Sequence, residues 1–223
     1  MAAIDLIIFI GDFMEHFGDA VILCGGKSRR MGFDKALMKI GEDYAIDIAT
    51  KKLLQIFKNV SLSVNGSDSD KFLHFGINIV EDIFKDDIGP AAAVHAALSS
   101  AKSKYVFVIA VDMPLLNIQH ISHMRSLVQR HVPDALIPIN AGFTEPLYAF
   151  YSVDAVDILE KEIREGEYGL PKIFPKFNTY YMKESESLRF DSKLAMFTNL
   201  NFVEDLSTIS LFAKNSLPAP ESK

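Results

Sequence analysis

The strongest constraint on the fold is a continuous apolar run, Tyr105–Val111, with the sequence YVFVIAV. A run of β-branched and aromatic residues without alternation predicts a strand buried on both faces, as in parallel sheets. A second run of this kind, Ala20–Cys24, stops at Gly25-Gly26. Strands buried on both faces need helices on either side. The sequence therefore favours an α/β fold in three layers, α/β/α, with a mostly parallel sheet.

Shorter strand-like runs alternate with helical patterns along the rest of the chain, as parallel sheets require. Pro90 suits the first turn of an Ala-rich helix, and Asn117 and Ser152 are predicted to cap two further helices. The other predicted strands are Val60–Val64, Ile77–Val80, Ala135–Pro138, Leu147–Tyr151 and Phe197–Leu200. The predicted helices are 43–57, 90–101, a stretch after Asn117, a stretch from Ser152 to about Arg164, and a stretch opened by Asn201 with Glu204.

Composition narrows the class of protein. With 223 residues, 49% of them hydrophobic, the chain suits one large domain or two small ones. Twenty-nine acids against 23 bases argue against a general binder of nucleic acid, although a local anion site stays open. One cysteine excludes an internal disulfide and fits a reducing cytosol, so a cytoplasmic location is expected. No apolar run approaches the roughly 20 residues of a membrane span, and no signal peptide is evident.

The segment that follows the Ala20–Cys24 run departs from the acidic average. Residues 24–35 hold three glycines and four bases against one acid. Gly25 and Gly26 let backbone N–H groups approach a phosphate, and the bases can neutralise its oxygens. The segment matches neither the P-loop nor the dinucleotide fingerprint. A solvated basic turn is the alternative interpretation. The four bases are Lys27, Arg29, Arg30 and Lys35.

Polar residues that follow predicted strands are the other candidates, since parallel sheets bind ligands beyond the carboxyl ends of their strands. Asp112 could hold Mg²⁺, which takes one or two carboxylates with phosphate oxygens, or could simply open a turn. Asp82 could face the same edge or be an ordinary surface acid. Asn65 could contact a base or ribose, or be a turn residue.

Two other site types are disfavoured. His120 and His123 have i, i+3 spacing, but the absence of an evident third ligand argues against zinc. Cys24 has no His or Asp partner at a usable spacing, so a small buried residue is the better interpretation than a nucleophile.

These pieces occur in a recognisable order: Leu23-Cys24-Gly25-Gly26, then Ser28, Arg30, Met31, Gly32, Asp34, Lys35 and Leu37, then Asn65, Val80–Asp82, Gly89-Pro90, Asp112–Pro114, Glu145–Ala149, and Asn199–Asn201 with Glu204–Leu206. Over about residues 19–210 the chain resembles the molybdenum cofactor guanylyltransferases (MobA-like), a branch of the GT-A-like nucleotidyltransferases. The resemblance implies a Rossmann-like three-layer sandwich of the nucleotide-diphospho-sugar transferase type.

The resemblance also implies a reaction. GMP would pass from GTP to the terminal phosphate of molybdenum-molybdopterin, giving molybdopterin guanine dinucleotide and pyrophosphate. GTP and molybdenum-molybdopterin would be the substrates and Mg²⁺ the metal. Proteins that deliver or receive the cofactor would be transient partners, with no nucleic acid or membrane involved. The implied roles are GTP binding for Leu23, Cys24, Gly25, Gly26, Lys35, Asn65, Asp82 and Asp112, catalysis for Arg30, Lys35 and Asp112, and Mg²⁺ binding for Asp112.

The chain departs from the family pattern in a few places. Cys24 stands where alanine is usual, and Ala91–Ala93 replaces a usual Leu-Ala-Gly.

Residues 1–18 precede the family's first strand and are interpreted as an N-terminal extension. Residues 19–213 are interpreted as a single nucleotidyltransferase domain, and residues 214–223 as a frayed tail. Candidates near the pterin are Gly142–Tyr148, Arg29 and Lys176.

Two alternatives stay open. The first is a sibling enzyme such as a molybdopterin cytidylyltransferase. Gly25-Gly26 favours guanine by resemblance, because the sibling branch usually has Ala-Ala-Gly there. The second is a catalytically idle nucleotide-binding domain, against which Lys35 and Asp112 argue.

Overall fold

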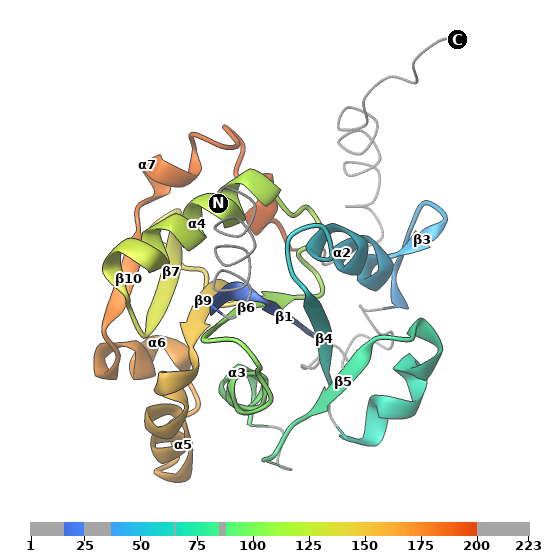
Figure 1. The fold of residues 1–223 in the computed structure, drawn as a ribbon, viewed down its shortest axis with the longest axis horizontal. Helices are drawn as coiled ribbons and strands as arrows, with labels where there is room; N and C mark the ends of the chain where they lie inside the picture. Colours follow the sequence, from blue (N-terminus) through green and yellow to red (C-terminus); the bar gives the residue numbers. More distant parts are fainter. Residues whose placement is uncertain (1–15, 25–36, 65, 85–87, 200–223) are drawn as a thin grey trace, which may run out of the picture.

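The computed structural model describes residues 16–24, 37–64, 66–84 and 88–199. An eight-stranded sheet forms its centre (Figure 1). All strands on its main path run in one direction except β9, which pairs antiparallel with both neighbours. The path is β10 (Thr179–Met182), β7 (Ala135–Asn140), β9 (Tyr148–Ser152), β6 (Tyr105–Ala110), β1 (Asp19–Leu23), β4 (Asn59–Val64) and β5 (Asn78–Glu81), with β8 (Phe143–Thr144) paired to β7.

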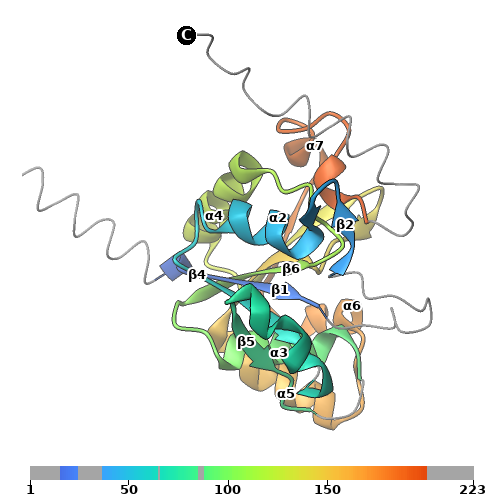
Figure 2. The same ribbon diagram turned by 90° about the vertical axis from the view of Figure 1, so that its right-hand side faces the viewer.

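Helices cover both faces of the sheet, which gives the three predicted layers (Figure 2). Helices α2 (Ala45–Leu53) and α4 (Ile118–His131) lie on one face, and α3 (Pro90–Ser99) and α5 (Val156–Arg164) on the other. Because successive strand residues point to opposite faces, β1 and β6 contribute side chains to two separate hydrophobic cores. Ile22 and Phe107 belong to the first core, Val21 and Val108 to the second.

Local signals in the sequence placed most elements correctly. The predicted strands up to residue 152 are all found, with ends shifted by one or two residues. The Asn117 Oδ1 atom accepts a hydrogen bond from the His120 amide at 3.0 Å, which confirms the predicted cap of α4. Pro90 opens α3, as predicted. The Ser152 hydroxyl accepts from the Asp154 amide at 3.2 Å at the start of the turn that leads into α5.

The strand predicted at Phe197–Leu200 is wrong. Phe197 ends a 3-10 turn, and Thr198 and Asn199 are exposed and outside any strand. The Asp191 carboxylate accepts from the Ala195 amide, and Leu194 adopts a left-handed backbone (φ 50°), so the chain turns here instead of extending. Leu200 and the helix predicted after Asn201 lie outside the described residues.

Several elements had no clear signal in the sequence, β10 and β8 among them. The helix predicted at 43–57 is shorter, because its first residues form a strand and it ends at Leu53.

No helix within the described ranges is long and apolar enough to cross a membrane. The smaller elements are β2 (Lys39–Ile40), β3 (Asp43–Tyr44), α6 (Leu170–Ile173), α7 (Glu184–Ser187), and the 3-10 segments η3 (Gly66–Phe75), η4 (Val153–Ala155), η5 (Phe174–Lys176) and η6 (Ala195–Phe197).

The residues just before β1 pack with the domain. Phe17 is 1% exposed, and its ring stacks on Tyr105 with 5.5 Å between centroids. The predicted extension therefore shares its last residues with the core. Residues 1–15 and the predicted tail, 214–223, lie outside the described part of the chain.

A buried carboxylate joins three strands at the amino edge of the sheet. Asp19 accepts hydrogen bonds from the amides of Lys102 and Ser103 at 2.5 and 2.7 Å, and from the Asn59 side-chain amide at 2.6 Å. Lys102 and Ser103 precede β6, and Asn59 opens β4. Asp19 thereby ties β1 to both of its neighbours.

We expect Asp19→Ala to lower the free energy of unfolding by about 3 kcal/mol, because it leaves buried amides without an acceptor. Chemical denaturation measures this change. Asp43→Ala is the matched control, since Asp43 forms an exposed ion pair with Lys51 and such pairs contribute little. Equal stability of the two variants would contradict the role given to Asp19.

Candidate active site

The carboxyl ends of β5, β4, β1 and β6 meet at one edge of the sheet, because these four strands are parallel neighbours. Two hydrogen bonds continue the pairing past β1. The Cys24 amide donates to the Ser63 carbonyl at 2.8 Å, and the Val111 amide donates to the Leu23 carbonyl at 3.1 Å. Of the predicted site residues, the structure brings Leu23, Cys24, Asp82 and Asp112 to this edge. The others, Gly25, Gly26, Arg30, Lys35 and Asn65, lie outside the described residues.

The two carboxylates stand apart along the edge. Asp82 follows β5 and Asp112 comes shortly after β6, with β4 and β1 between these strands. Three strand spacings separate β5 from β6, or about 14 Å. Both carboxylates are half-buried. An elongated ligand lying across β4 and β1 would therefore reach both, whereas a single small ion would not.

A turn presents Asp112. The Met113 amide donates to the Ala110 carbonyl at 3.1 Å, so the chain reverses just beyond the end of β6. The turn interpretation and the ligand interpretation of Asp112 are therefore compatible: the residue lies in a turn, and the turn lies at the carboxyl edge of the sheet.

Ser63 lies next to Asp82, and sequence reasoning missed it. The residue is 2% exposed, and its hydroxyl donates to Asp82 Oδ1 at 3.2 Å. The sequence shows only serines that alternate with apolar residues in this strand, Ser61 and Ser63, and it does not distinguish between the two.

The β7–β8 hairpin stands at the same edge, because β7 runs in the direction of β6. Its turn, Ala141-Gly142, has positive φ angles of 48° and 81°. A two-residue turn of this kind matches the twist of the flanking strands. The Glu184 carboxylate accepts a hydrogen bond from the Ala141 amide, so the C-terminal segment holds the hairpin tip.

Glu145 lies at the base of this hairpin. Its amide donates to the Pro138 carbonyl at 2.9 Å, and its carboxylate accepts from the Asn140 side chain at 2.8 Å. The Leu147 carbonyl, two residues on, accepts from the Ala110 amide at 2.9 Å, which places this segment beside the Asp112 turn. Burial raises the pKa of Glu145, and the bond from Asn140 opposes the shift. Glu145 lies within Gly142–Tyr148, a candidate segment near the pterin, but the sequence assigns its carboxylate no role of its own.

Other sequence candidates lie elsewhere. Lys176 precedes β10, whose start is at the amino edge of the sheet, and its ammonium pairs with Glu162 at 3.8 Å. Arg29 lies outside the described residues. His120 is buried against Ser187, with 3.0 Å between its Nε2 atom and the hydroxyl.

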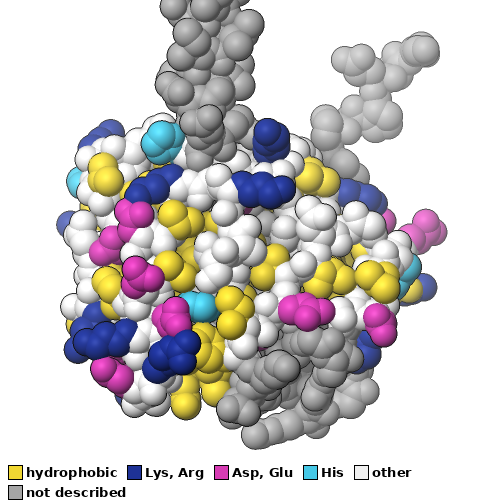
Figure 3. All heavy atoms as spheres, turned by 60° about the horizontal axis from the view of Figure 1, so that its bottom comes forward, with side chains coloured by type: hydrophobic (Ala, Val, Ile, Leu, Met, Phe, Trp, Pro, Cys, Tyr) yellow, Lys and Arg dark blue, Asp and Glu magenta, His cyan; other side chains and the backbone are white. Residues whose placement is uncertain are grey.

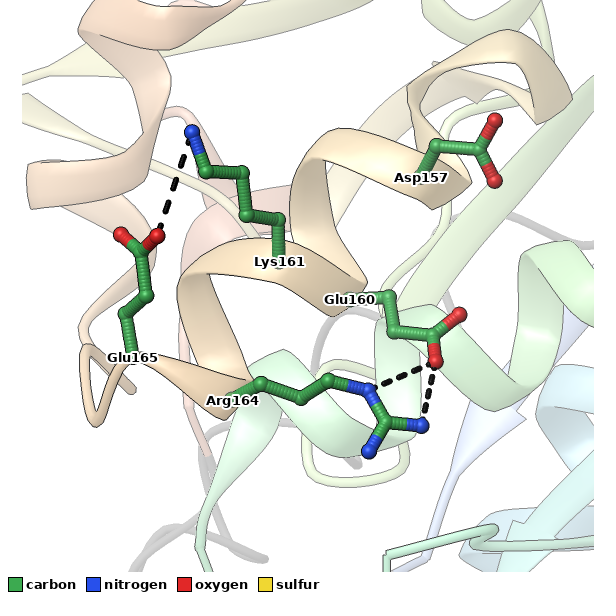
Figure 4. Close-up of a pocket in the computed structure, with 5 residues that line it drawn as sticks. All are labelled: Asp157, Glu160, Lys161, Arg164 and Glu165. Carbon is green, nitrogen blue, oxygen red and sulfur yellow. Dashed lines mark hydrogen bonds and ion pairs between the residues drawn. The ribbon is translucent and has the colours of Figure 1, made fainter.

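A pocket on the surface of α5 is a poor candidate (Figure 4). Its lining side chains pair with one another along a single helix, as Arg164 does with Glu160 at 2.6 Å. His95 on α3 also reaches Glu160, with 3.7 Å between its Nε2 atom and the carboxylate, so Glu160 already has partners on two helices. The side chains of both signs in Figure 3 are interspersed with apolar ones and form no basic surface on that face. The lining residues are Asp157, Glu160, Lys161, Arg164 and Glu165.

Residues 20–179 match the MobA-like NTP transferase domain. The chain belongs to this family. A probable molybdenum cofactor guanylyltransferase from Peptoclostridium acidaminophilum is 34% identical over 207 residues, covering 91% of this chain and 92% of that protein. The molybdenum cofactor guanylyltransferase of Syntrophotalea carbinolica is 34% identical over 189 residues, covering 85% and 89%.

Solved structures agree with the MobA-like assignment. Molybdopterin-guanine dinucleotide biosynthesis protein A from Archaeoglobus fulgidus superimposes with a TM-score of 0.77 at 26% identity, covering 88% of this chain and 99% of that one. The 4-diphosphocytidyl-2C-methyl-D-erythritol synthase of Anaerococcus prevotii, with a TM-score of 0.65 at 11% identity, covers 92% and 99% and shares the fold. This MobA-like chain is a nucleotidyltransferase.

The carboxyl edge of the sheet suits a divalent cation in one way. Within the described ranges no three His, Cys, Asp or Glu side chains gather into a metal site. These described residues therefore do not form a metal site whose ligands all come from the protein. Mg²⁺ needs no such cage, since one carboxylate together with phosphate oxygens and water completes its shell. Asp112 at the strand edge meets that requirement.

The raised pKa of Glu145 predicts a pH-dependent gain in stability on its neutralisation. Its folded-state pKa lies above its unfolded value, so the carboxylate destabilises the fold increasingly as pH rises through that interval. We expect Glu145→Gln, which keeps an acceptor for Asn140, to raise Tm at pH 7.5 and to leave Tm nearly unchanged at pH 4. Thermal denaturation at both pH values tests this expectation. An equal shift at both would show that the burial of charge is not the cause.

Proposed function

We propose that this chain transfers GMP from GTP to the terminal phosphate of molybdenum-molybdopterin, forming molybdopterin guanine dinucleotide and pyrophosphate. The observation that carries the proposal is 34% identity, over 91% of the chain, to a protein named as a probable molybdenum cofactor guanylyltransferase. The gathering of Cys24, Asp82 and Asp112 at one sheet edge supports it. Contacts with proteins that deliver and receive the cofactor, and a cytoplasmic location, belong to the same proposal.

The nucleotide occupies the side of the edge formed by β5, β4 and β1. Asp82 and Asn65 contact the guanosine, and Leu23, Cys24, Gly25 and Gly26 bind the nucleotide between Asp82 and Asp112. Arg30 and Lys35 neutralise the phosphates. The span of about 14 Å between β5 and β6 suits a nucleoside with its phosphates extended across the edge.

Asp112 holds Mg²⁺ in this proposal. When bound, the ion neutralises charge on the triphosphate and on the leaving pyrophosphate. The carboxylate at the end of β6 fixes where that charge is neutralised, because a turn closed by the Met113–Ala110 hydrogen bond holds it.

The acceptor approaches from the other side of Asp112. The nucleotide covers β5 to β1, so the part of the edge left for the acceptor is formed by β9 and the β7–β8 hairpin. We assign the pterin to the segment Gly142–Tyr148 on this part of the edge. The hairpin is held by Glu184 at its tip and by Asn140 at its base, so it is a preorganised surface.

The chemistry then needs little more than placement. A terminal phosphate oxygen of the pterin bonds to the α-phosphorus of GTP, the bond from that phosphorus to the bridging oxygen breaks, and pyrophosphate leaves. No protein group forms a covalent bond. Orientation of the two phosphates and neutralisation of their charge account for the rate.

A turnover assay with purified cofactor and Mg²⁺ tests the proposal. We expect release of pyrophosphate with GTP and little with CTP, because a pocket built for one base leaves its polar groups unpaired with the other. Faster turnover with CTP would identify a cytidylyltransferase. Binding of GTP without pyrophosphate release would identify an idle nucleotide-binding domain.

Asp112→Ala and Lys35→Ala test the assignment of the phosphate groups. We expect each to lower turnover by about 10²–10³-fold, since each removes one preorganised charge from the reacting phosphates, with no change in Tm. The control is Asp157→Ala, which removes an exposed carboxylate on α5, away from the edge. Normal turnover in the Asp112 or Lys35 variant would refute the role of that residue.

A further inference from the structure

Ser63 is a buried hydroxyl in an apolar setting. Its register partners are Leu23 on β1 and Val80 on β5, and residues that pair in register point to the same face of a sheet. That face is covered by α3 and carries the second core. Ser63 as a whole is only 2% exposed.

A hydroxyl at such a position needs an explanation. Burying it costs free energy unless it is hydrogen-bonded, and alanine or valine would fill the site without that cost. The hydroxyl donates to Asp82 Oδ1 at 3.2 Å. Asp82 follows Val80 by two residues, so alternation along the chain turns its side chain toward the face on which Ser63 lies.

Ser63 also contacts the neighbouring strand end. Its carbonyl accepts from the Cys24 amide at 2.8 Å. One residue of β4 therefore touches two of the groups at the nucleotide side of the edge: the backbone that leads out of β1 and the carboxylate that follows β5.

We propose that Ser63 is a positioning residue for the nucleotide: its hydroxyl fixes the orientation of the Asp82 carboxylate toward the N–H or O–H donors of the nucleoside. The inference rests on the proposed function and deepens it. Ser63 does not itself touch the substrate. A carboxylate held in one rotamer loses less freedom when the nucleoside binds, so the contact lowers the Kd and KM for GTP and leaves the chemical step unchanged.

The test compares Ser63→Ala with Ser61→Ala. Ser61 lies two residues earlier on the same strand, points to the same face, and is further from the edge. We expect Ser63→Ala to raise the Kd and KM for GTP roughly five- to tenfold, the effect of one hydrogen bond, with kcat within about twofold of wild type. Ser61→Ala should leave Kd, KM and kcat unchanged. A merely structural role would lower Tm without this split between KM and kcat.

A double-mutant cycle shows whether Ser63 acts through Asp82. In an Asp82→Ala background, we expect Ser63→Ala to cause no further rise in Kd. A further rise of the same size would overturn the proposed route.

Failure of this inference can be told apart from failure of the proposed function. If Asp82→Ala weakens GTP binding and Ser63→Ala does not, the positioning role is overturned and the guanylyltransferase stands. If the wild-type protein binds no GTP, the proposed function is overturned, and the role of Ser63 with it.

Discussion

The buried carboxylate of Asp19 sets the geometry on which the site depends. Strands buried on both faces carry little register information of their own, because a shift by one residue still presents apolar side chains to both cores. Asp19 supplies that information with hydrogen bonds to the segment before β6 and to Asn59 at the start of β4. With the amino ends aligned, Leu23 falls opposite both Ser63 and Ala110 at the far edge.

The two edges of the sheet use carboxylates differently. At the amino edge, Asp19 is 6% exposed and accepts hydrogen bonds from three donors, which makes it a structural group. At the carboxyl edge, Asp82 and Asp112 are half-buried, and burial raises the pKa of Glu145. A half-buried carboxylate whose pKa is raised by burial is a common feature of binding sites, and at this edge Glu145 is such a group.

The sequence predicts correctly those elements whose signals lie within a few neighbouring residues. The apolar run of β6, the Pro90 helix start and the Asn117 cap are encoded within a few residues, and the structure confirms all three. The antiparallel insertion of β9 depends on pairing between distant strands, which periodicity does not report. Phe197 illustrates the reverse case. Its local pattern resembled a strand, but a hydrogen bond from the Ala195 amide to the Asp191 carboxylate and the left-handed backbone of Leu194 turn the chain. Ser63 becomes a candidate only through its contact with Asp82, and the contacts of Glu145 single it out within the candidate segment Gly142–Tyr148.

The reversed strand β9 explains why the edge has two unlike halves. A parallel strand would need a crossover of a dozen or more residues, usually a helix, whereas an antiparallel strand can follow a hairpin. In the sequence, β1 is followed by the glycine-rich basic segment, to which the proposal assigns the phosphates. The side toward β9 is walled by the β7–β8 hairpin, which Glu184 and Glu145 hold in place. In the proposed arrangement, a charged donor and a larger acceptor bind on opposite sides of one carboxylate, which is the placement that transfer between two phosphates requires.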